Sequence, residues 1–294
     1  MVNFARKNFC RGVIKMSLSK KILACLTALL MMILSSAVAL AAESGVDWER
    51  GVIRAKGIGA GKSTTKNKGL KRAQARRAAM MDAQRGLAEA AKGVRVTSNS
   101  KMIDLELADD RVATQVDTII KNMTEVDGRY IEADELYEII LEMPLFGSTD
   151  SLSTAAFIPF KDEPKVSFPQ PVNMNQPTVA NKNYTGLIID CSGTGKKINH
   201  VMSPVIKNGN GQESYGHKNL DYDKIIVQGM ASYANSSNDQ ISQSRAGSNP
   251  LIIRAIRLDD LDANPVVSVE DADKILAANQ HDGFLDKCAV VFVK

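Results

Sequence analysis

The sequence has few of the residues and motifs that carry catalysis or metal binding. Its four cysteines form no Cys-x-x-Cys pair, and its three histidines, His200, His217 and His281, are scattered singly. It contains no Gly-x-Ser-x-Gly nucleophile turn and no His-Glu-x-x-His pair. A metal centre needs several such ligands at short spacing. We therefore expect no metal, no cofactor and no enzymatic activity.

An uncharged apolar run occupies residues 22–42, directly after Lys20 and Lys21. A basic start, an apolar middle and small residues at the end form the pattern of an export signal. We expect residues 1–41 to be a signal peptide, and Met16 also fits its start. The alternative is an uncleaved membrane anchor, because about 20 apolar residues can span a bilayer. Both alternatives predict a periplasmic or secreted protein.

The charge balance changes when this leader is removed. Residues 1–41 hold six basic residues and no acidic one, so 31 basic and 33 acidic residues remain. A near-neutral protein lacks the electrostatic footprint of a nucleic-acid binder. We expect no nucleic-acid partner, and contact with a membrane only through an uncleaved leader.

Two cysteines, Cys191 and Cys288, remain after cleavage. In an oxidising compartment they could pair as a disulfide. They could equally be two buried free thiols, since unpaired cysteine is often buried. Cys191 lies in the segment Asp190-Cys191-Ser192-Gly193, where a predicted strand ends in a Gly-rich loop. No histidine lies near it in sequence, so a nucleophile is not indicated.

The distribution of proline divides the chain into two α+β domains, each expected to be a sheet covered by one or two helices. Five of the nine prolines fall between residues 147 and 182. Proline forces extended backbone and removes hydrogen-bond donors. We expect a first domain at residues 47–147, a Pro/Asn-rich linker or surface strap at 148–183, and a C-terminal domain at 184–294.

Apolar periodicity predicts the elements of each domain. A helix over residues 69–91 carries a line of small residues, Ala75, Ala79 and Ala83, which favours close packing on a sheet. The other elements expected in the first domain are strands at 51–57, 93–96, 126–131 and 136–145 and a helix at 108–122. In the second we expect strands at 185–190, 205–207, 213–215, 251–258 and 288–293, a helix at 268–279 and a polar loop at 235–249.

The segment from Gly57 to Thr64 imitates a phosphate-binding loop. The full pattern, Gly-x-x-x-x-Gly-Lys-Ser/Thr, needs a glycine where this chain has Lys56. Because the first turn of such a loop depends on that glycine, nucleotide binding is not indicated. We expect a Gly-rich turn from strand to helix instead.

Charge is unevenly distributed along the first domain. Residues 54–85 hold ten basic residues and one acid, Asp82, whereas acids dominate residues 104–142. One interpretation is a solvated helix face, and another is pairing of opposite charges between copies. A third is a patch for an anionic envelope polymer or a membrane surface. The residues of that patch would be Arg54, Lys56, Lys62, Arg72, Arg76 and Arg77.

Several motifs of residues 48–147 match a known pattern. They are Trp48-Glu49-Arg50-Gly51, Gly57-Ile58-Gly59, the helix segment 73–87, Gly93-Val94-Arg95-Val96 and the closing segment 143–147. This part of the chain resembles the bacterial twenty-kilodalton surface lipoprotein family and the N-terminal domain of flagellar assembly protein T. The resemblance implies a non-catalytic envelope protein of bacteria, part of a periplasmic ring or a surface assembly.

Together these observations lead us to expect a non-catalytic exported envelope protein that acts as a structural or assembly component through its surfaces. Its partners would be other envelope proteins, flagellar ones among them, or further copies of itself. The alternative is a binding module for an anionic polymer or membrane surface through residues 54–85. An enzyme of another type would show a deep polar pocket at the ends of the strands at 185–190 and 251–258.

Overall fold

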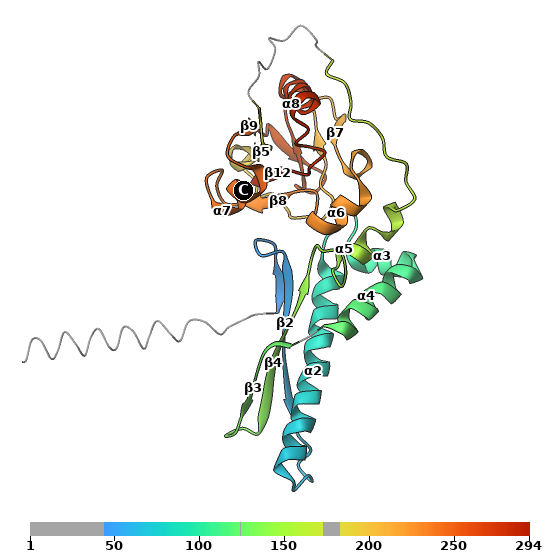
Figure 1. The fold of residues 1–294 in the computed structure, drawn as a ribbon, viewed down its shortest axis with the longest axis vertical. Coiled ribbons are helices and arrows are strands. Elements are labelled where there is room, and N and C mark those ends of the chain that lie inside the picture. Colours follow the sequence, from blue (N-terminus) through green and yellow to red (C-terminus); the bar gives the residue numbers. More distant parts are fainter. Residues whose placement is uncertain (1–43, 124, 173–182) are drawn as a thin grey trace, which may run out of the picture. The chain divides into compact units, whose positions relative to one another are not determined.

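A computed structural model describes residues 44–123, 125–172 and 183–294, and it mixes helices and sheets throughout (Figure 1). This confirms the α+β class. The predicted signal peptide lies outside the described residues. The strands are β1 (Gly45–Asp47), β2 (Val52–Ala60), β3 (Glu125–Ile131), β4 (Leu136–Pro144), β5 (Gly186–Asp190), β6 (Ile206–Lys207), β7 (Glu213–Tyr215), β8 (Ser232–Ala234), β9 (Pro250–Arg254), β10 (Arg257–Asp259), β11 (Asn264–Val266) and β12 (Val290–Val293). The helices are α2 (Lys68–Gly93), α3 (Met102–Ala108), α4 (Asp110–Asn122), α5 (Ser153–Ala156), α6 (Tyr222–Gln228), α7 (Gln240–Ala246) and α8 (Val269–Asp282).

The first four strands form an antiparallel sheet in the order β1-β2-β4-β3. Strands β2 and β4 pair along nine residues each, from Val52 opposite Pro144 to Ala60 opposite Leu136. Buried and partly exposed residues alternate along both strands, as a sheet covered on one face requires. Helix α2 provides that cover (Figure 1).

Helix α2 lies against β2 at a distance that side chains would prevent. A Cβ atom added to Gly57 or Gly59 would stand less than 3.0 Å from backbone atoms of Ala79 in α2. On the helix side the contact is made by Ala75, Ala79 and Ala83, which are fully buried. The predicted close packing of this helix is therefore confirmed. The predicted Gly-rich turn is wrong at these positions, because Gly57 and Gly59 lie within strand β2.

The strand expected at residues 93–96 is absent from the structure. Helix α2 continues through Gly93, and Val94 caps its end. The following residues form a tight turn in which Val96 N donates to Ser100 O at 2.9 Å. The chain then enters α3, which the sequence analysis missed. Lys101 N donates to Asp104 Oδ2 at 2.7 Å, which supports the start of this short helix.

The C-terminal part contains a four-stranded sheet in the order β8-β12-β5-β9, in which all neighbours are parallel. Helix α7 packs on one face, where Ala246 joins a cluster with Ile188 and Val291. The other face belongs to a larger core that includes Phe292 and, from α8, Ile275. Both faces of the central strands are thus buried, as is usual for parallel sheets. A small mixed sheet has the order β10-β11-β6-β7.

Two predicted boundaries in this part are wrong. Residues 235–249 are not all loop, because Asp239 caps α7 by accepting from Ser242 N at 2.8 Å. Residues 251–258 form two strands instead of one. Ala255 N still donates to Asp190 O in the parallel sheet, whereas Ile256 N donates to Val266 O in the small mixed sheet. The chain changes sheets between these residues.

The proline-rich segment is only partly a surface strap. Residues 151–153 and 155–157 are buried, and Ser153 Oγ donates to Ile226 O of α6 at 2.8 Å. The prediction of a linker is therefore wrong for these residues, because apolar side chains such as Phe157 belong to the hydrophobic core. Residues 161–167 are exposed, and Val166 N donates to Lys218 O at 2.7 Å, as a strap would. Residues 173–182 lie outside the described residues.

The antiparallel sheet and the C-terminal part share one hydrophobic core, and Glu43–Lys294 form one compact unit. Backbone hydrogen bonds join them at two places. Met202 N donates to Arg95 O at 3.0 Å, just beyond the end of α2. Gly147 N donates to Ile226 O at 3.0 Å, just beyond β4. The two parts are therefore held together by main-chain contacts as well as by side chains.

Replacing Gly59 by alanine tests the close approach of α2. The new methyl group would meet helix backbone, which cannot rotate away, so we expect Gly59→Ala to lower the free energy of unfolding by about 1–3 kcal/mol. The matched control is Gly93→Ala, because a Cβ at Gly93 meets no atom within 4 Å. Alanine there should be neutral or stabilise by up to about 1 kcal/mol. Urea unfolding measures both, and equal midpoints for the two variants would contradict the packing.

Candidate functional site

Two of the six predicted patch residues, Arg54 and Lys56, lie on the face of β2 opposite α2. Arg54 Nε donates to Glu142 Oε2 at 2.6 Å, across the strand pair. Lys56 Nζ lies 2.7 Å from Glu138 Oε1, and Arg129 of β3 pairs with the same carboxylate at 2.7 Å. Hydrogen bonds from Lys56 and then Arg129 lower the pKa of Glu138. These three cations therefore share two carboxylates of strand β4, and Arg50 also pairs with Glu142 at 3.5 Å.

Two further residues of the predicted patch, Arg72 and Arg76, project from α2 toward β3. Arg76 Nε donates to Glu125 Oε2 at 3.0 Å, and this bond raises the pKa of Arg76. The guanidinium carbon of Arg72 lies 5.2 Å from the ring centroid of Tyr130. That distance is within the range of a cation–π contact. Both side chains therefore have partners in β3.

The six residues do not form one patch. Lys62 follows β2 and Arg77 lies on α2, and both are exposed with no ion pair to the residues that the structure describes. Arg54 and Lys56 lie on the opposite side of the sheet from α2. Most of the basic stretch thus pairs with acids of the same chain, because β3 and β4 bring the acidic segment beside it. The single continuous patch expected from the sequence is wrong.

Cys191 and Cys288 are both free and buried in the structure. Of the two alternatives left open by the sequence, a disulfide and two buried thiols, the structure shows two buried thiols. Burial, with a smaller contribution from Asp190, raises the pKa of Cys191 to about 12. Its thiol donates to Ile189 O at 3.8 Å. A thiol that stays protonated is a poor nucleophile. In the adjoining loop, Asp190 Oδ1 accepts from Ser192 N at 3.0 Å and closes the turn.

A contact that the sequence analysis missed joins the β1–β2 hairpin to the parallel sheet. Trp48, at the tip of the hairpin, packs against His200 and Tyr233 with ring-centroid distances of 5.5 and 5.8 Å. Tyr233 is in turn fixed by its hydroxyl, which accepts from Val201 N at 2.9 Å and donates to Val201 O at 3.0 Å. The chain's single tryptophan therefore lies in an aromatic site of the C-terminal part.

The next residue of the tip, Glu49, makes the polar half of the same contact. Its Oε1 accepts from Asn235 Nδ2 at 2.9 Å and lies 3.3 Å from Lys294 Nζ. Asn235 directly follows β8, and Lys294 directly follows β12. The carboxylate thus lies at the carboxyl ends of two parallel strands. In open parallel sheets this is the edge where ligands usually bind.

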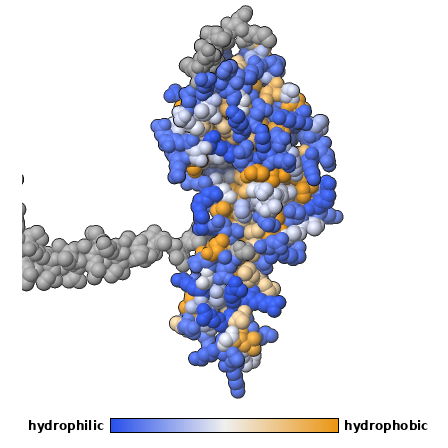
Figure 2. Space-filling model, in the orientation of Figure 1, coloured by the Kyte–Doolittle hydropathy of each residue, from blue (hydrophilic) through white to orange (hydrophobic). Residues whose placement is uncertain are grey.

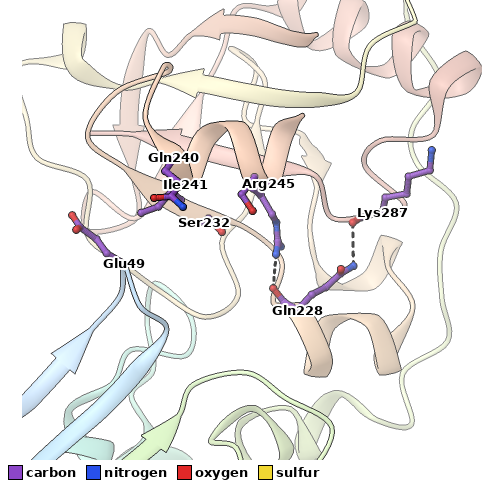
Figure 3. Close-up of a pocket in the computed structure, with 8 residues that line it drawn as sticks. Glu49, Gln228, Ser232, Gln240, Ile241, Arg245 and Lys287 are labelled. Atoms are coloured by element: carbon purple, nitrogen blue, oxygen red, sulfur yellow. Dashed lines mark hydrogen bonds between the residues drawn. The ribbon is translucent and has the colours of Figure 1, made fainter. Parts of the chain in front are cut away.

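A polar groove lies beside Glu49, and Arg245 of α7 forms part of its wall (Figure 3). Its guanidinium donates to Gln228 O at 2.6 Å, Gly229 O at 2.6 Å and Cys288 O at 2.7 Å. Two of these carbonyls end helix α6, where a cation interacts favourably with the helix dipole. Burial lowers the pKa of Arg245. Arg245 therefore caps the C-terminal end of α6. The other residues that line the groove are Glu49, Gln228, Ser232, Gln240, Ile241, Ser244 and Lys287.

Within residues 44–123, 125–172 and 183–294, no three His, Cys, Asp or Glu side chains gather closely enough to hold a metal ion. In the same ranges, no helix has the length and apolar character needed to cross a bilayer.

Comparison with known proteins concerns the C-terminal part. Residues 186–294 match the model of a family described as the second domain of Treponema pallidum Tp0624. The match begins at the first residue of β5 and covers the whole parallel sheet and the small mixed sheet. No curated protein matches the chain. The resemblance of residues 48–147 to the lipoprotein and flagellar families stays a prediction.

Removing the Arg245 guanidinium tests its structural role. Arg245→Ala leaves three backbone carbonyls without their charged donor, so we expect the free energy of unfolding to fall by about 2–3 kcal/mol. Arg254→Ala is the matched control, because Arg254 is exposed on the edge strand β9 and no hydrogen bond or ion pair joins it to the described residues. Its loss should change stability by less than about 0.5 kcal/mol. Similar losses in thermal or urea unfolding for both variants would contradict this role.

Proposed function

We propose that this protein is a non-catalytic exported component of the bacterial cell envelope that binds other proteins through its surface. The observation that supports this most directly is the face of the antiparallel sheet opposite α2. Along β2 and β4, every residue on that face is at least partly exposed, and Ile58 is 47% exposed. The edge strand β3 pairs only with β4 among the described strands.

The charges of this face favour a protein partner over a polymer. Arg54, Lys56 and Arg129 are each paired with Glu142 or Glu138, so these carboxylates offset part of their positive charge. A surface that mixes paired charges with partly exposed apolar residues is compatible with the composition of non-obligate protein interfaces. Figure 2 likewise shows hydrophobic residues scattered in small groups among hydrophilic ones on the face in view. The uncharged run at residues 22–42 supports export.

Photo-crosslinking in intact cells tests the proposal. With a photoreactive amino acid at position 58, we expect an adduct with another envelope protein or with a second copy, because this side chain lies on the proposed binding face. Position 107 is the matched control, since Leu107 is 81% exposed on α3, away from the sheet. The adduct should form only at position 58 and only in the envelope fraction. Equal labelling at both positions, or protein that stays in the cytoplasm, would refute the proposal.

A second candidate function is binding of an anionic polymer at the start of α2. Lys62, Lys66 and Lys68 are exposed there and form no ion pair with the described residues. The start of a helix also carries a partial positive charge. This smaller cluster is what remains of the expected patch once Arg54, Lys56 and Arg76 are paired.

Binding to a sulfated polysaccharide distinguishes this second candidate. It predicts salt-sensitive binding that is lost when Lys62 and Lys66 are both replaced by glutamate. Lys274→Glu, an exposed substitution on α8, is the control and should bind as the wild type does. Binding that does not depend on salt, or that the double variant and the Lys274→Glu control weaken equally, would contradict polymer binding. Neither result would bear on the proposal of a protein partner.

A further inference from the structure

The tip of the β1–β2 hairpin closes the carboxyl edge of the parallel sheet. It belongs to the antiparallel sheet, yet Glu49 is held by the residues that follow β8 and β12, Asn235 and Lys294. In open parallel sheets this edge is where ligands usually lie. The chain therefore covers with its own carboxylate a position that already holds an amide donor and an ammonium group.

The indole of Trp48 holds this tip in place against an unusual histidine. The ring centroid of His200 lies 5.5 Å from that of Trp48 and 4.2 Å from that of Tyr233. His200 Nε2 is buried and has no hydrogen-bond partner among the described residues. A buried polar atom without a partner is uncommon and weakens its surroundings. The closed contact therefore carries the free-energy cost of an unsatisfied nitrogen at His200.

The charged groups around His200 come from every element that packs near it. Lys294 follows β12, Lys197 precedes His200 in its own loop, and Arg95 lines the same hollow beside the end of α2. Glu49 of the hairpin tip is the one acid among them. A proton on His200 would add a fourth cation to this group while half-enclosed by two aromatic rings. Only Glu49 would oppose the repulsion.

We propose that Trp48 and Glu49 form a latch over the carboxyl edge of the parallel sheet, and that protonation of His200 opens it. When the latch opens, the indole leaves His200 and Tyr233, and the imidazole becomes hydrated. The Glu49 carboxylate leaves Asn235 and Lys294, which then face solvent. The two parts of the chain stay joined elsewhere by the hydrogen bonds of Arg95 with Met202 and of Gly147 with Ile226.

The direction of the pH effect follows from the two states of His200. Burial first, and then Lys294 and Lys197, lower the pKa of His200 to about 4 in the closed latch, whereas Glu49 opposes them. In the open latch the imidazole regains an ordinary pKa of about 6.5. The open state then binds the proton more readily, so the latch is closed above that pH. Between about 6.5 and 4 the open-to-closed ratio rises up to tenfold per pH unit.

Fluorescence of Trp48 measures the latch directly, because the chain has no other tryptophan. As the pH falls from 7 to 4, we expect the emission maximum to shift to longer wavelength and acrylamide quenching to increase, while far-UV circular dichroism stays constant. His200→Phe keeps an aromatic ring beside Trp48 but cannot be protonated, so its emission should not change over this range. His281→Gln is the matched control, since His281 is an exposed histidine of α8, and it should behave as the wild type does.

Three results would overturn the proposal. The first is an emission maximum and quenching that do not change in the wild type between pH 7 and 4. The second is the same pH-dependent change in the His200→Phe variant, which would assign the transition to another group. The third is a loss of far-UV circular dichroism together with the fluorescence shift, because that would be general acid unfolding instead of a local opening.

Discussion

Helix α2 lies on strand β2 so closely that Gly57 and Gly59 leave no room for a Cβ atom. Both elements are long, and the residues at one end of each contact the C-terminal part. Strand β2 leads back through the hairpin to Trp48, which packs on Tyr233. Arg95, two residues after the end of α2, accepts a hydrogen bond from Met202 N at its carbonyl oxygen. The spacing of these two elements therefore decides where the antiparallel sheet can meet the parallel sheet.

The same arrangement brings the opposite charges of the chain together. Helix α2 returns the chain so that β4 lies beside β2 and β3 beside β4, and the acids of β3 and β4 meet the basic residues of β2 and α2. Each surface ion pair contributes little to stability, about 0–1 kcal/mol. Their effect on recognition is larger, because carboxylates such as Glu142 beside Arg54 weaken the field that would attract a polyanion. A mixed-charge face of this kind favours a protein partner over a polyanion.

Local pattern predicted several of the longer elements and missed short ones such as α3, α6 and β8. The helix with Ala75, Ala79 and Ala83 in line, the strands expected at 205–207 and 213–215 and the helix expected at 268–279 are present in the structure as α2, β6, β7 and α8. These features depend on neighbours in the sequence. Helix α7 was missed because its polar residues look like a loop, and it depends on Gly186, where a Cβ atom would stand less than 3.0 Å from Ala246.

The candidate site was harder to predict, because it depends on pairs distant in sequence. Arg54 and Glu142 are 88 residues apart, and Glu49 and Lys294 are 245 apart. No local pattern reveals that a charged side chain has such a partner, so the basic stretch looked free. Trp48 begins the motif Trp48-Glu49-Arg50-Gly51, yet nothing near it in sequence indicates His200 or Tyr233 as its neighbours. Its being the chain's single tryptophan was the available signal.

We infer that the antiparallel sheet and the C-terminal part, with its parallel and small mixed sheets, are one folded body. A shared core and contacts at the ends of β2 and α2 hold them together. Scanning calorimetry of the purified protein tests this inference most directly. A single body unfolds in one transition whose calorimetric enthalpy equals the van't Hoff enthalpy. Two separate transitions, one for the antiparallel sheet with α2 and one for the C-terminal part, would contradict this inference.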